Sequence, residues 1–469
     1  MSGTKKNIVL TIIADRDADF FLSVANQLVL QGYHIFFLTF YGPAESKIQK
    51  CGYDVLNLHS IINLDREPIL RPNFPEDLEK KYKIKSIRDL LLHENMTFNR
   101  KNEIDLLKKC AVYLEAIQTW LEDIKPNVVI QELGGFIAPM SLYHACKRNG
   151  IKHIFIEPMM FQGTLGFVEN TINYTIKVKR QSRNNAVQKY VEKYMASQNA
   201  VIPKKDQHHF RDATLAKLIN FQNIRKLALK IWYKFFLRTE QEYDAISNHI
   251  WRNFRMIINR KKLSTFYWLH ENLPSNKKYV YFPLHVPLDF QLTVRSKEWL
   301  NQIALLERIS NFLPPGVDLW IKEHPAAIGA YSIKELKKLL SSPNVKIIHP
   351  LENSFSIIHN ASAVITINSK VGAEALMQGK PLFVLGQAFY RNHGITYDVS
   401  SIPELEKELT DFLKNKSNLR PSNKKIKDFL NAVWAKSLPG ELYVNTSENI
   451  NKFASSLIKA LESRKSLKE

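Results

Sequence analysis

Cysteine is scarce in this sequence, with three residues among 469. Cys51, Cys110 and Cys146 form no CxxC pair and no cluster at metal-ligand spacing, so neither a disulfide framework nor a zinc site is expected. No apolar run approaches the roughly 20 residues that a membrane-spanning helix needs. The first apolar run, residues 8–14, is too short for a signal peptide and lacks a cleavage site. We therefore expect a cytoplasmic protein that is neither exported nor inserted across a membrane.

Two nucleotide-binding motifs are also missing. The chain contains no GxGxxG sequence and no P-loop, which argues against a dinucleotide oxidoreductase and against an NTPase. No motif typical of RNA or DNA binding occurs either. We expect no cofactor.

The composition is that of an ordinary globular protein, with 45% hydrophobic and 24% charged residues, and the length suggests two domains. The formal net charge is +21 and is unevenly spread. Residues 177–262 carry 20 Lys and Arg against 6 Asp and Glu. Such a basic segment attracts an anionic partner, which could be nucleic acid, an anionic lipid surface or an acidic glycan.

Apolar runs of strand length alternate with helical patterns at the start of the chain. The expected elements are strands at 7–14 and 34–40 around a helix at 18–31, then a helix at 104–121, strands at 127–131 and 153–157, and a helix at 137–148. This order predicts a doubly wound, parallel α/β domain.

The same pattern restarts at residue 278. Strands are expected at 278–282, 317–322, 345–348, 363–367 and 382–385, with helical segments at 299–313 and 448–461. We therefore predict an N-terminal Rossmann-like domain (1–176), a basic helical connector (177–265), a C-terminal Rossmann-like domain (266–445), and a C-terminal helix and tail (446–469).

Polar residues follow several strands of the second domain, where open α/β sheets bind ligands. The motifs are Leu284-His-Val-Pro287, Lys322-Glu-His-Pro325, Asn368-Ser-Lys-Val-Gly-Ala-Glu374, and the segment from Gly386 to Tyr390. Alone, each is an ordinary turn, helix cap or bend. Together, at the ends of successive strands, they favour one shared ligand site, with a helix N-terminus suited to phosphate.

These motifs also carry a resemblance to a known family. Tyr279 to His285, the Lys322 to Pro325 motif, Val364 to Ser369 with Gly372-Ala-Glu-Ala375, Gly379-Lys-Pro381 and Gly386 to Tyr390 look like the capsule polysaccharide biosynthesis family, which contains bacterial transferases of the acidic sugar Kdo. A weaker likeness covers residues 150–174. The resemblance implies a GT-B fold, two Rossmann-like domains facing a cleft, and for many members a CMP-activated acidic sugar.

By this resemblance, the donor nucleotide binds the C-terminal domain. His324 and Ser369 would stabilise the departing phosphate together with the dipole of the following helix, without a metal ion. The residues assigned to the donor site are Lys322, His324, Asn368, Ser369, Gly372, Glu374 and Gly386.

The N-terminal motif of the Kdo and sialic acid enzymes is an acidic pair followed by glycine, whereas this chain has Glu157-Pro158-Met159. Glu157 is the remaining carboxylate. It is expected to act as base or nucleophile, or to form a structural salt bridge.

Residues of the acceptor side are expected at the ends of N-terminal strands. Asp15-Arg-Asp17 formally matches the DxD sequence of metal-dependent transferases, but the helix dipole and basic side chains of a GT-B enzyme make a metal bridge unnecessary. We assign Asp15, Asp17, Gly134 and Gly135 to acceptor contacts, with plain loop structure as the alternative for the glycines.

Lys226, Lys230, Lys234 and Arg238 recur every four residues on one predicted helix, and Ile224, Leu227, Ile231 and Phe235 lie on another side. The interpretation is a basic helix that faces an anionic membrane. Packing against the domains and nucleic-acid binding are the alternatives.

The predicted function is a glycosyltransferase of capsular or surface polysaccharide biosynthesis. Its partners would be a nucleotide-sugar donor and a glycan or lipid-linked acceptor. The alternatives are a sugar-nucleotide epimerase of similar fold and a non-catalytic protein that binds glycan or nucleic acid.

Overall fold

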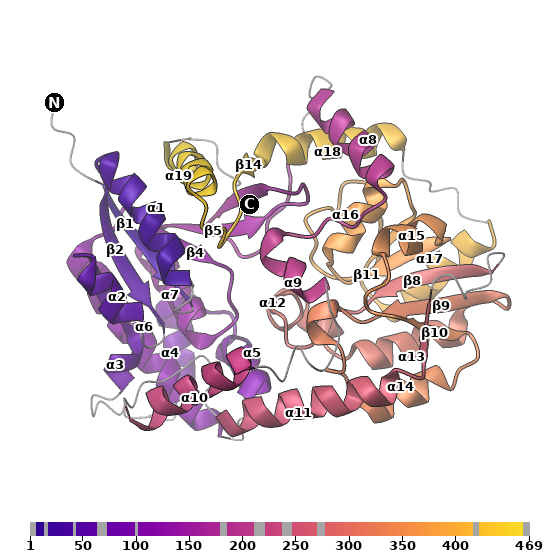
Figure 1. The fold of residues 1–469 in the computed structure, drawn as a ribbon, viewed down its shortest axis with the longest axis horizontal. Coiled ribbons are helices and arrows are strands. Elements are labelled where there is room, and N and C mark those ends of the chain that lie inside the picture. The colour runs from indigo at the N-terminus through magenta and orange to yellow at the C-terminus, as the bar shows by residue number, and fades with distance from the viewer. Residues whose placement is uncertain are drawn as a thin grey trace.

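The computed structural model describes residues 6–13, 17–40, 44–62, 73–98, 102–178, 185–210, 221–236, 246–269, 277–415 and 422–462. Two seven-stranded sheets lie side by side in these residues, each in its own domain (Figure 1). Both sheets are wound in the same way, as the sequence predicts.

The first sheet has the order β14-β6-β5-β4-β1-β2-β3. Its strands are β1 (Asn7–Ile12), β2 (His34–Thr39), β3 (Asp54–Asn57), β4 (Val128–Glu132), β5 (Lys152–Pro158), β6 (Thr164–Glu169) and β14 (Leu438–Pro439). Strands β1 to β5 are parallel, and β6 and β14 are antiparallel to their neighbours. The purely parallel sheet expected from the sequence is therefore wrong at one edge.

Both faces of the first sheet are buried. Ile8, Leu10 and Ile12 pack with α1 (Ala18–Leu30) and α19 (Ser447–Glu462), whereas Val9 faces the opposite core. This alternation follows from the two-residue period of a strand. The remaining helices of the domain are α2 (Ala44–Lys50), α3 (Leu58–Ile62), α4 (Phe74–Tyr82), α5 (Ile87–Phe98), α6 (Glu103–Ile124) and α7 (Ile137–Asn149).

The second sheet has the order β13-β12-β11-β8-β9-β10-β7 and is parallel throughout. Its strands are β7 (Tyr267–Trp268), β8 (Lys278–Pro283), β9 (Val317–Lys322), β10 (Val345–Ile348), β11 (Ala363–Thr366), β12 (Leu382–Val384) and β13 (Tyr397–Asp398). From β8 onward the strand order is that of a Rossmann fold, and it reverses between β8 and β11.

Helices cover both faces of this sheet as well. They are α12 (Phe290–Thr293), α13 (Gln302–Phe312), α14 (Ile333–Leu340), α15 (Ser354–Asn360), α16 (Lys370–Met377), α17 (Ile402–Leu413) and α18 (Asn423–Lys436), with 3-10 turns η5 (Lys297–Trp299) and η6 (Pro325–Ala327). Val280 and Phe282 face one core, and Tyr279 and Tyr281 the other.

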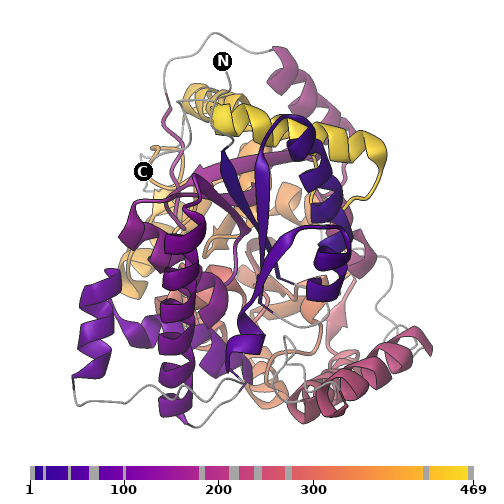
Figure 2. The ribbon, with the colours of Figure 1, turned by 90° about the vertical axis from the view of Figure 1, so that its left-hand side faces the viewer.

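The connector is helical where it is described. It contains α8 (Asn185–Ser197), η2 (Lys204–Asp206), α9 (Gln207–Phe210), α10 (Phe221–Phe235) and α11 (Ile246–Leu263). Helices α10 and α11 lie along the lower edge of the molecule in both ribbon views (Figures 1 and 2).

The end of the described chain returns to the first domain. Leu438–Pro439 pairs with β6, and Ile450, Phe453 and Leu457 of α19 belong to the first domain's core. Residues 438–439 thus pair with the sheet of the first domain, although they fall within the range 266–445 predicted for the C-terminal domain, and the predicted domain division stays a prediction. A two-residue strand has no periodicity that could reveal this return.

Candidate functional site

A cavity of about 350 Å³ lies between the two domains. Its wall combines the end of β5, the connector segment 200–206 and the loops that follow β8, β9 and β11. The second sheet reverses its strand order between β8 and β11, which is where doubly wound sheets bind ligands. The volume is within the range of small-molecule sites.

His285 and Asn368 meet at this reversal point. The backbone N–H of Asn368 points to Nε2 of His285 at 3.5 Å, and burial lowers the pKa of His285 to about 3, so the ring is neutral. The Asn368 side-chain NH₂ donates to the carbonyl of Gln291 at 2.8 Å and to Ser296 Oγ at 3.1 Å. Its Oδ1 is buried and has no partner among the described residues. This oxygen is an acceptor that a ligand hydroxyl or amino group could satisfy.

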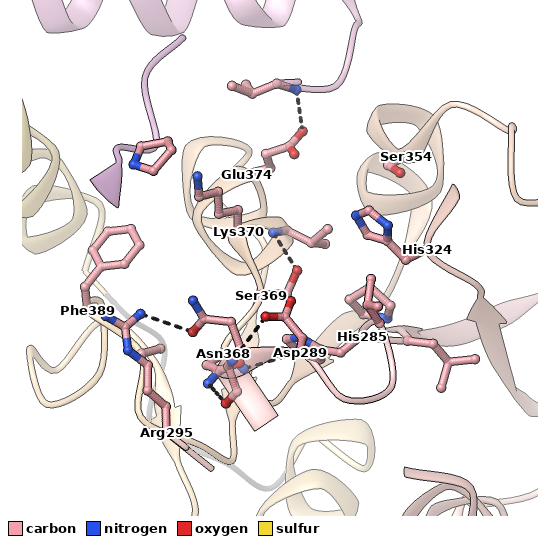
Figure 3. A pocket seen from close by; sticks show the side chains of 18 of the residues that line it. His285, Asp289, Arg295, His324, Ser354, Asn368, Ser369, Lys370, Glu374 and Phe389 are labelled. Carbon is pink, nitrogen blue, oxygen red and sulfur yellow. Dashed lines mark hydrogen bonds between the residues drawn. The ribbon is translucent and has the colours of Figure 1, made fainter. Parts of the chain in front are cut away.

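Ser369 caps the N-terminus of α16. Its Oγ accepts the N–H of Val371 at 3.2 Å, and Ser369, Lys370 and Val371 all line the cavity. The positive end of a helix dipole therefore lies at the cavity wall, an arrangement that stabilises phosphate. Figure 3 shows Ser369 and Lys370 between His324 on one side and Arg295 and Phe389 on the other.

His324 is fixed in one tautomer. Its Nδ1 accepts the N–H of Ala326 at 3.1 Å, which places the ring proton of the neutral form on Nε2. Burial lowers the pKa of His324, as does Lys322, while Asp206 of the connector opposes the shift. Pro325 holds the preceding backbone extended. The side chain is thus a neutral hydrogen-bond donor at the cavity rim.

Lys322 and Glu374 form a buried pair of titratable groups in the wall. Burial lowers the pKa of Lys322 to about 8, although Glu374 opposes the shift; its Nζ donates to Ser354 Oγ at 2.7 Å. Burial raises the pKa of Glu374 to about 7, although it accepts from the Val201 N–H at 3.3 Å and the Tyr194 hydroxyl at 3.1 Å. Glu374 thereby holds the connector over the cavity.

The two glycines assigned to the donor site do not line the cavity. A Cβ on Gly372 would lie 2.4 Å from the hydroxyl of Tyr390, and one on Gly386 would lie 2.3 Å from Ser296 Oγ. Tyr390 donates to the Ser369 carbonyl at 2.7 Å. Gly372 and Gly386 therefore allow close packing of the loops behind the site.

Glu157 lines the cavity and is paired with Arg295. The two guanidinium nitrogens donate to the two carboxylate oxygens, each at 3.0 Å, and both side chains are buried. Arg295 also donates to the Ile172 carbonyl at 2.7 Å. Glu157 belongs to the first domain and Arg295 to the second, so the pair joins the two domains at the cavity. Of the roles considered for Glu157, this geometry favours the structural one.

The residues assigned to the acceptor lie outside the cavity wall or outside the described residues. Asp15 is outside the described residues, and Asp17 is buried at the start of α1. A Cβ on Gly135 would lie 2.7 Å from the ring of His93, whose Nδ1 is 2.7 Å from Thr293 Oγ1 in the other domain. Gly134 packs against Pro139. The acceptor role of these four residues stays a prediction.

Several residues that line the cavity could not be predicted from sequence motifs. Arg295, Asp206, Asp289 and the segment 200–203 line the cavity but belong to no motif. Arg295 comes 138 residues after its partner Glu157, so no short motif contains both. Asp206 is an isolated acidic residue in a basic segment and forms no recognisable motif there. Among the described residues, no three His, Cys, Asp or Glu side chains gather into a metal-binding cluster.

The proposed membrane face of α10 is only partly described. Lys230 is half-buried and lies on the side of the helix opposite Trp232, which is exposed. The structure does not describe the side chains of Lys226 and Lys234 or any part of Arg238. No helix in the described part of the chain has the length and apolar character needed to cross a bilayer.

Two Rossmann-like domains that enclose a cavity at the switch point of the second sheet define a GT-B protein. A family model described as "Capsule polysaccharide biosynthesis protein" matches residues 179–419, just over half of the chain. The chain belongs to this family. The match contains all of the motifs between Tyr279 and Tyr390 that carry the resemblance, and it leaves out residues 150–174, where the likeness is weaker.

Curated relatives match a shorter segment. The capsule polysaccharide modification protein LipA of Neisseria meningitidis is 31% identical over 101 residues, 22% of this chain and 14% of that protein. The capsule polysaccharide export protein KpsS of Escherichia coli is 33% identical over 106 residues, 22% of this chain and 26% of that protein. The chain thus spans about a quarter or less of the length of these relatives.

Solved structures match a larger share of the chain, but at lower sequence identity. The beta Kdo 2,7 transferase KpsC of Thermosulfurimonas dismutans is 14% identical, with a TM-score of 0.36 over 74% of this chain and 90% of that one. A UDP-GlcNAc 2-epimerase of Neisseria meningitidis is 12% identical, with a TM-score of 0.28 over 97% of this chain and 100% of that one. These likenesses do not decide between a transferase and an epimerase.

Proposed function

We propose that this protein is a glycosyltransferase of capsular or surface polysaccharide biosynthesis. It transfers a sugar from a nucleotide donor to a glycan or lipid-linked glycan. The main observation in support of this function is that His285, His324 and Ser369, which follow β8, β9 and β11, all line one interdomain cavity. The proposed location is the cytoplasm, whose reducing environment suits three free thiols.

The donor phosphate binds between His324 and the N-terminus of α16. The Nε2–H of His324 donates to a phosphate oxygen, and the helix dipole and Lys322 stabilise its charge as the bond to the sugar breaks. No metal ion is needed for this arrangement. A CMP-activated acidic sugar such as Kdo is the proposed donor, on the ground of the family resemblance.

The acceptor enters from the first domain. Because Glu157 is held by Arg295, the candidates for general base are the other carboxylates of the cavity wall, which are Asp206, Asp289, Glu323 and Glu374. Closure of the domains around the donor excludes water that would otherwise hydrolyse it.

The test uses purified protein and CMP-, UDP- and GDP-sugars. A donor that binds the cavity raises the melting temperature by mass action, and its sugar should then pass to a capsular oligosaccharide acceptor. Stabilisation by the nucleotide in wild type but not in His324→Ala supports the proposed site. Conversion of a UDP-sugar without any acceptor supports the epimerase instead, and an absence of nucleotide binding contradicts both enzymes.

A further inference from the structure

An exposed aromatic surface lies on the connector, away from the cavity. Of the large apolar side chains that the described part of the chain exposes, ten lie between residues 221 and 254. On α10 and directly after it they are Phe221, Ile224, Leu229, Ile231, Trp232, Phe235 and Phe236, and on α11 they are Ile250, Trp251 and Phe254. Scattered apolar residues are normal on a surface, but a concentration of this kind marks an interaction site.

These residues share one side of each helix. Successive residues turn by about 100°, so the exposed apolar residues of α10 cover one half of its circumference. Trp232 is 50% exposed and Phe235 68% exposed, and Trp232 stacks on Phe236 with ring centroids 4.1 Å apart. The apolar side of α10 is thus exposed.

Basic residues accompany the aromatic residues on α11. Trp251 and Phe254 stack on its exposed side. Arg255, Lys261 and Lys262 lie on the same half of the helix circumference. Four Lys and Arg occur in α10 and five in α11, and neither helix contains Asp or Glu. Two copies of such a surface repel each other, whereas an anionic surface attracts it.

The opposite side of α11 forms hydrogen bonds with the second domain. Asn259 donates to the carbonyls of Gly329 and Tyr331 at 2.9 and 3.1 Å, and Arg260 Nε donates to that of Ile328 at 3.1 Å. Gly329 allows this contact, since a Cβ there would lie 2.5 Å from the Met256 carbonyl. The part of the exposed surface that lies on α11 is therefore held against residues 328–331, which follow His324.

We infer that α10 and α11 insert this aromatic surface into the interface of an anionic lipid bilayer. The rings of Trp232, Phe235, Trp251 and Phe254 enter the boundary between headgroups and acyl chains, and Arg225, Arg255, Lys261 and Lys262 contact the lipid phosphates. This attachment differs from a purely electrostatic one through Lys226, Lys230, Lys234 and Arg238, because apolar insertion persists when salt screens the charges. The inference adds a location to the proposed function without depending on it.

The experiment measures co-sedimentation of the full chain with vesicles of equal parts phosphatidylglycerol and phosphatidylcholine, and with phosphatidylcholine vesicles, in the absence of donor and acceptor. Wild type should bind the anionic vesicles, with a blue shift of tryptophan fluorescence, and raised salt should weaken the binding without abolishing it. Trp232→Ser with Phe235→Ser, and Trp251→Ser with Phe254→Ser, should each lower the partition coefficient roughly tenfold per ring.

Matched controls separate insertion from general effects. Leu30→Ser with Ile104→Ser removes exposed apolar groups from other helices and should leave binding unchanged. Trp232→Phe and Trp251→Phe should retain binding. Arg255→Gln with Lys261→Gln and Lys262→Gln should weaken binding, and Lys407→Gln with Lys424→Gln and Lys427→Gln, which removes the same charge elsewhere, should not.

Failure of wild type to bind anionic vesicles, or unchanged binding by the aromatic variants, overturns the inference. A concentration-dependent dimer that the aromatic substitutions dissociate, without vesicle binding by wild type, would assign the surface to a protein contact. None of these outcomes affects the nucleotide-binding test of the proposed function.

Discussion

Glu157 and Arg295 bind each other through two hydrogen bonds of 3.0 Å in a buried position where the two domains meet. The next residue, Ser296, accepts from Asn368 at 3.1 Å and from the Gln387 N–H at 3.1 Å. One short loop therefore contacts the first domain on one side and the proposed donor site on the other. Disturbing the ion pair should affect both domain contact and donor binding.

Glu157→Gln should lower the free energy of unfolding by about 3–5 kcal/mol, because it leaves the guanidinium of Arg295 buried without its counter-charge. Denaturant unfolding of the variant measures this loss. The double variant Glu157→Leu with Arg295→Met should recover much of the stability, since both charges are removed together. A Glu157→Gln protein with wild-type stability but no transfer activity would instead identify Glu157 as the catalytic carboxylate.

His324→Ala and Ser369→Ala should each weaken nucleotide binding by about 1.5–3 kcal/mol, because each removes a hydrogen-bonding group beside the expected phosphate. Isothermal titration with the stabilising nucleotide measures the change. Ser369→Ala also removes a helix cap, so Ser401→Ala, which removes the cap of α17, is the control. Equal nucleotide affinity in wild type and both cavity variants would exclude this phosphate site.

Glu374 should make stability depend on pH in a defined direction. Its pKa in the folded protein is raised to about 7 from an ordinary 4.5, so its protonated form stabilises the fold at low pH, and this contribution is lost as pH rises from about 4.5 to about 7. Glu374→Gln cannot ionise and keeps an acceptor for Tyr194 and Val201. The stability of this variant relative to wild type should therefore rise with pH across that range. A constant difference between the two proteins would contradict the raised pKa.

Lys322 should make donor binding depend on pH on the alkaline side. Burial lowers its pKa to about 8, so the ammonium that supports the phosphate is lost as pH rises through that value. Nucleotide affinity of wild type should fall there, and Lys322→Met should show weaker affinity without the same fall. A parallel pH profile in the two proteins would show that Lys322 does not contact the phosphate.

Gly372→Ala should destabilise the protein by about 1–3 kcal/mol, because the new methyl group would overlap the buried Tyr390 ring. Thermal unfolding measures the loss. Tyr390→Phe, which removes the hydroxyl that donates to Ser369 but adds nothing, should cost about 1 kcal/mol. If Gly372→Ala is as stable as wild type but binds no nucleotide, Gly372 contacts the ligand after all.

The sequence predicted the parts of this protein that local patterns determine. Apolar runs such as 278–282 and 363–367 are buried parallel strands, and the polar residues after them, His324 and Ser369 among them, do meet in one cavity. The partners of these residues could not be predicted in the same way. Arg295 and the strand Leu438–Pro439 acquire their roles from contacts with residues more than one hundred positions away, and no short pattern encodes such a contact.

The antiparallel pairing of β6 with β14 has a mechanical consequence for the whole molecule. The chain leaves the first domain after β6 and returns to it at β14, so both covalent links between the domains start from neighbouring strands at one edge of the first sheet. Two links so close together act as a single hinge. The contacts of α5 with the other domain, Asp89 with Lys297 and His93 with Thr293, are non-covalent. Opening of the two domains about this hinge should therefore break these contacts first, because they lie away from the hinge.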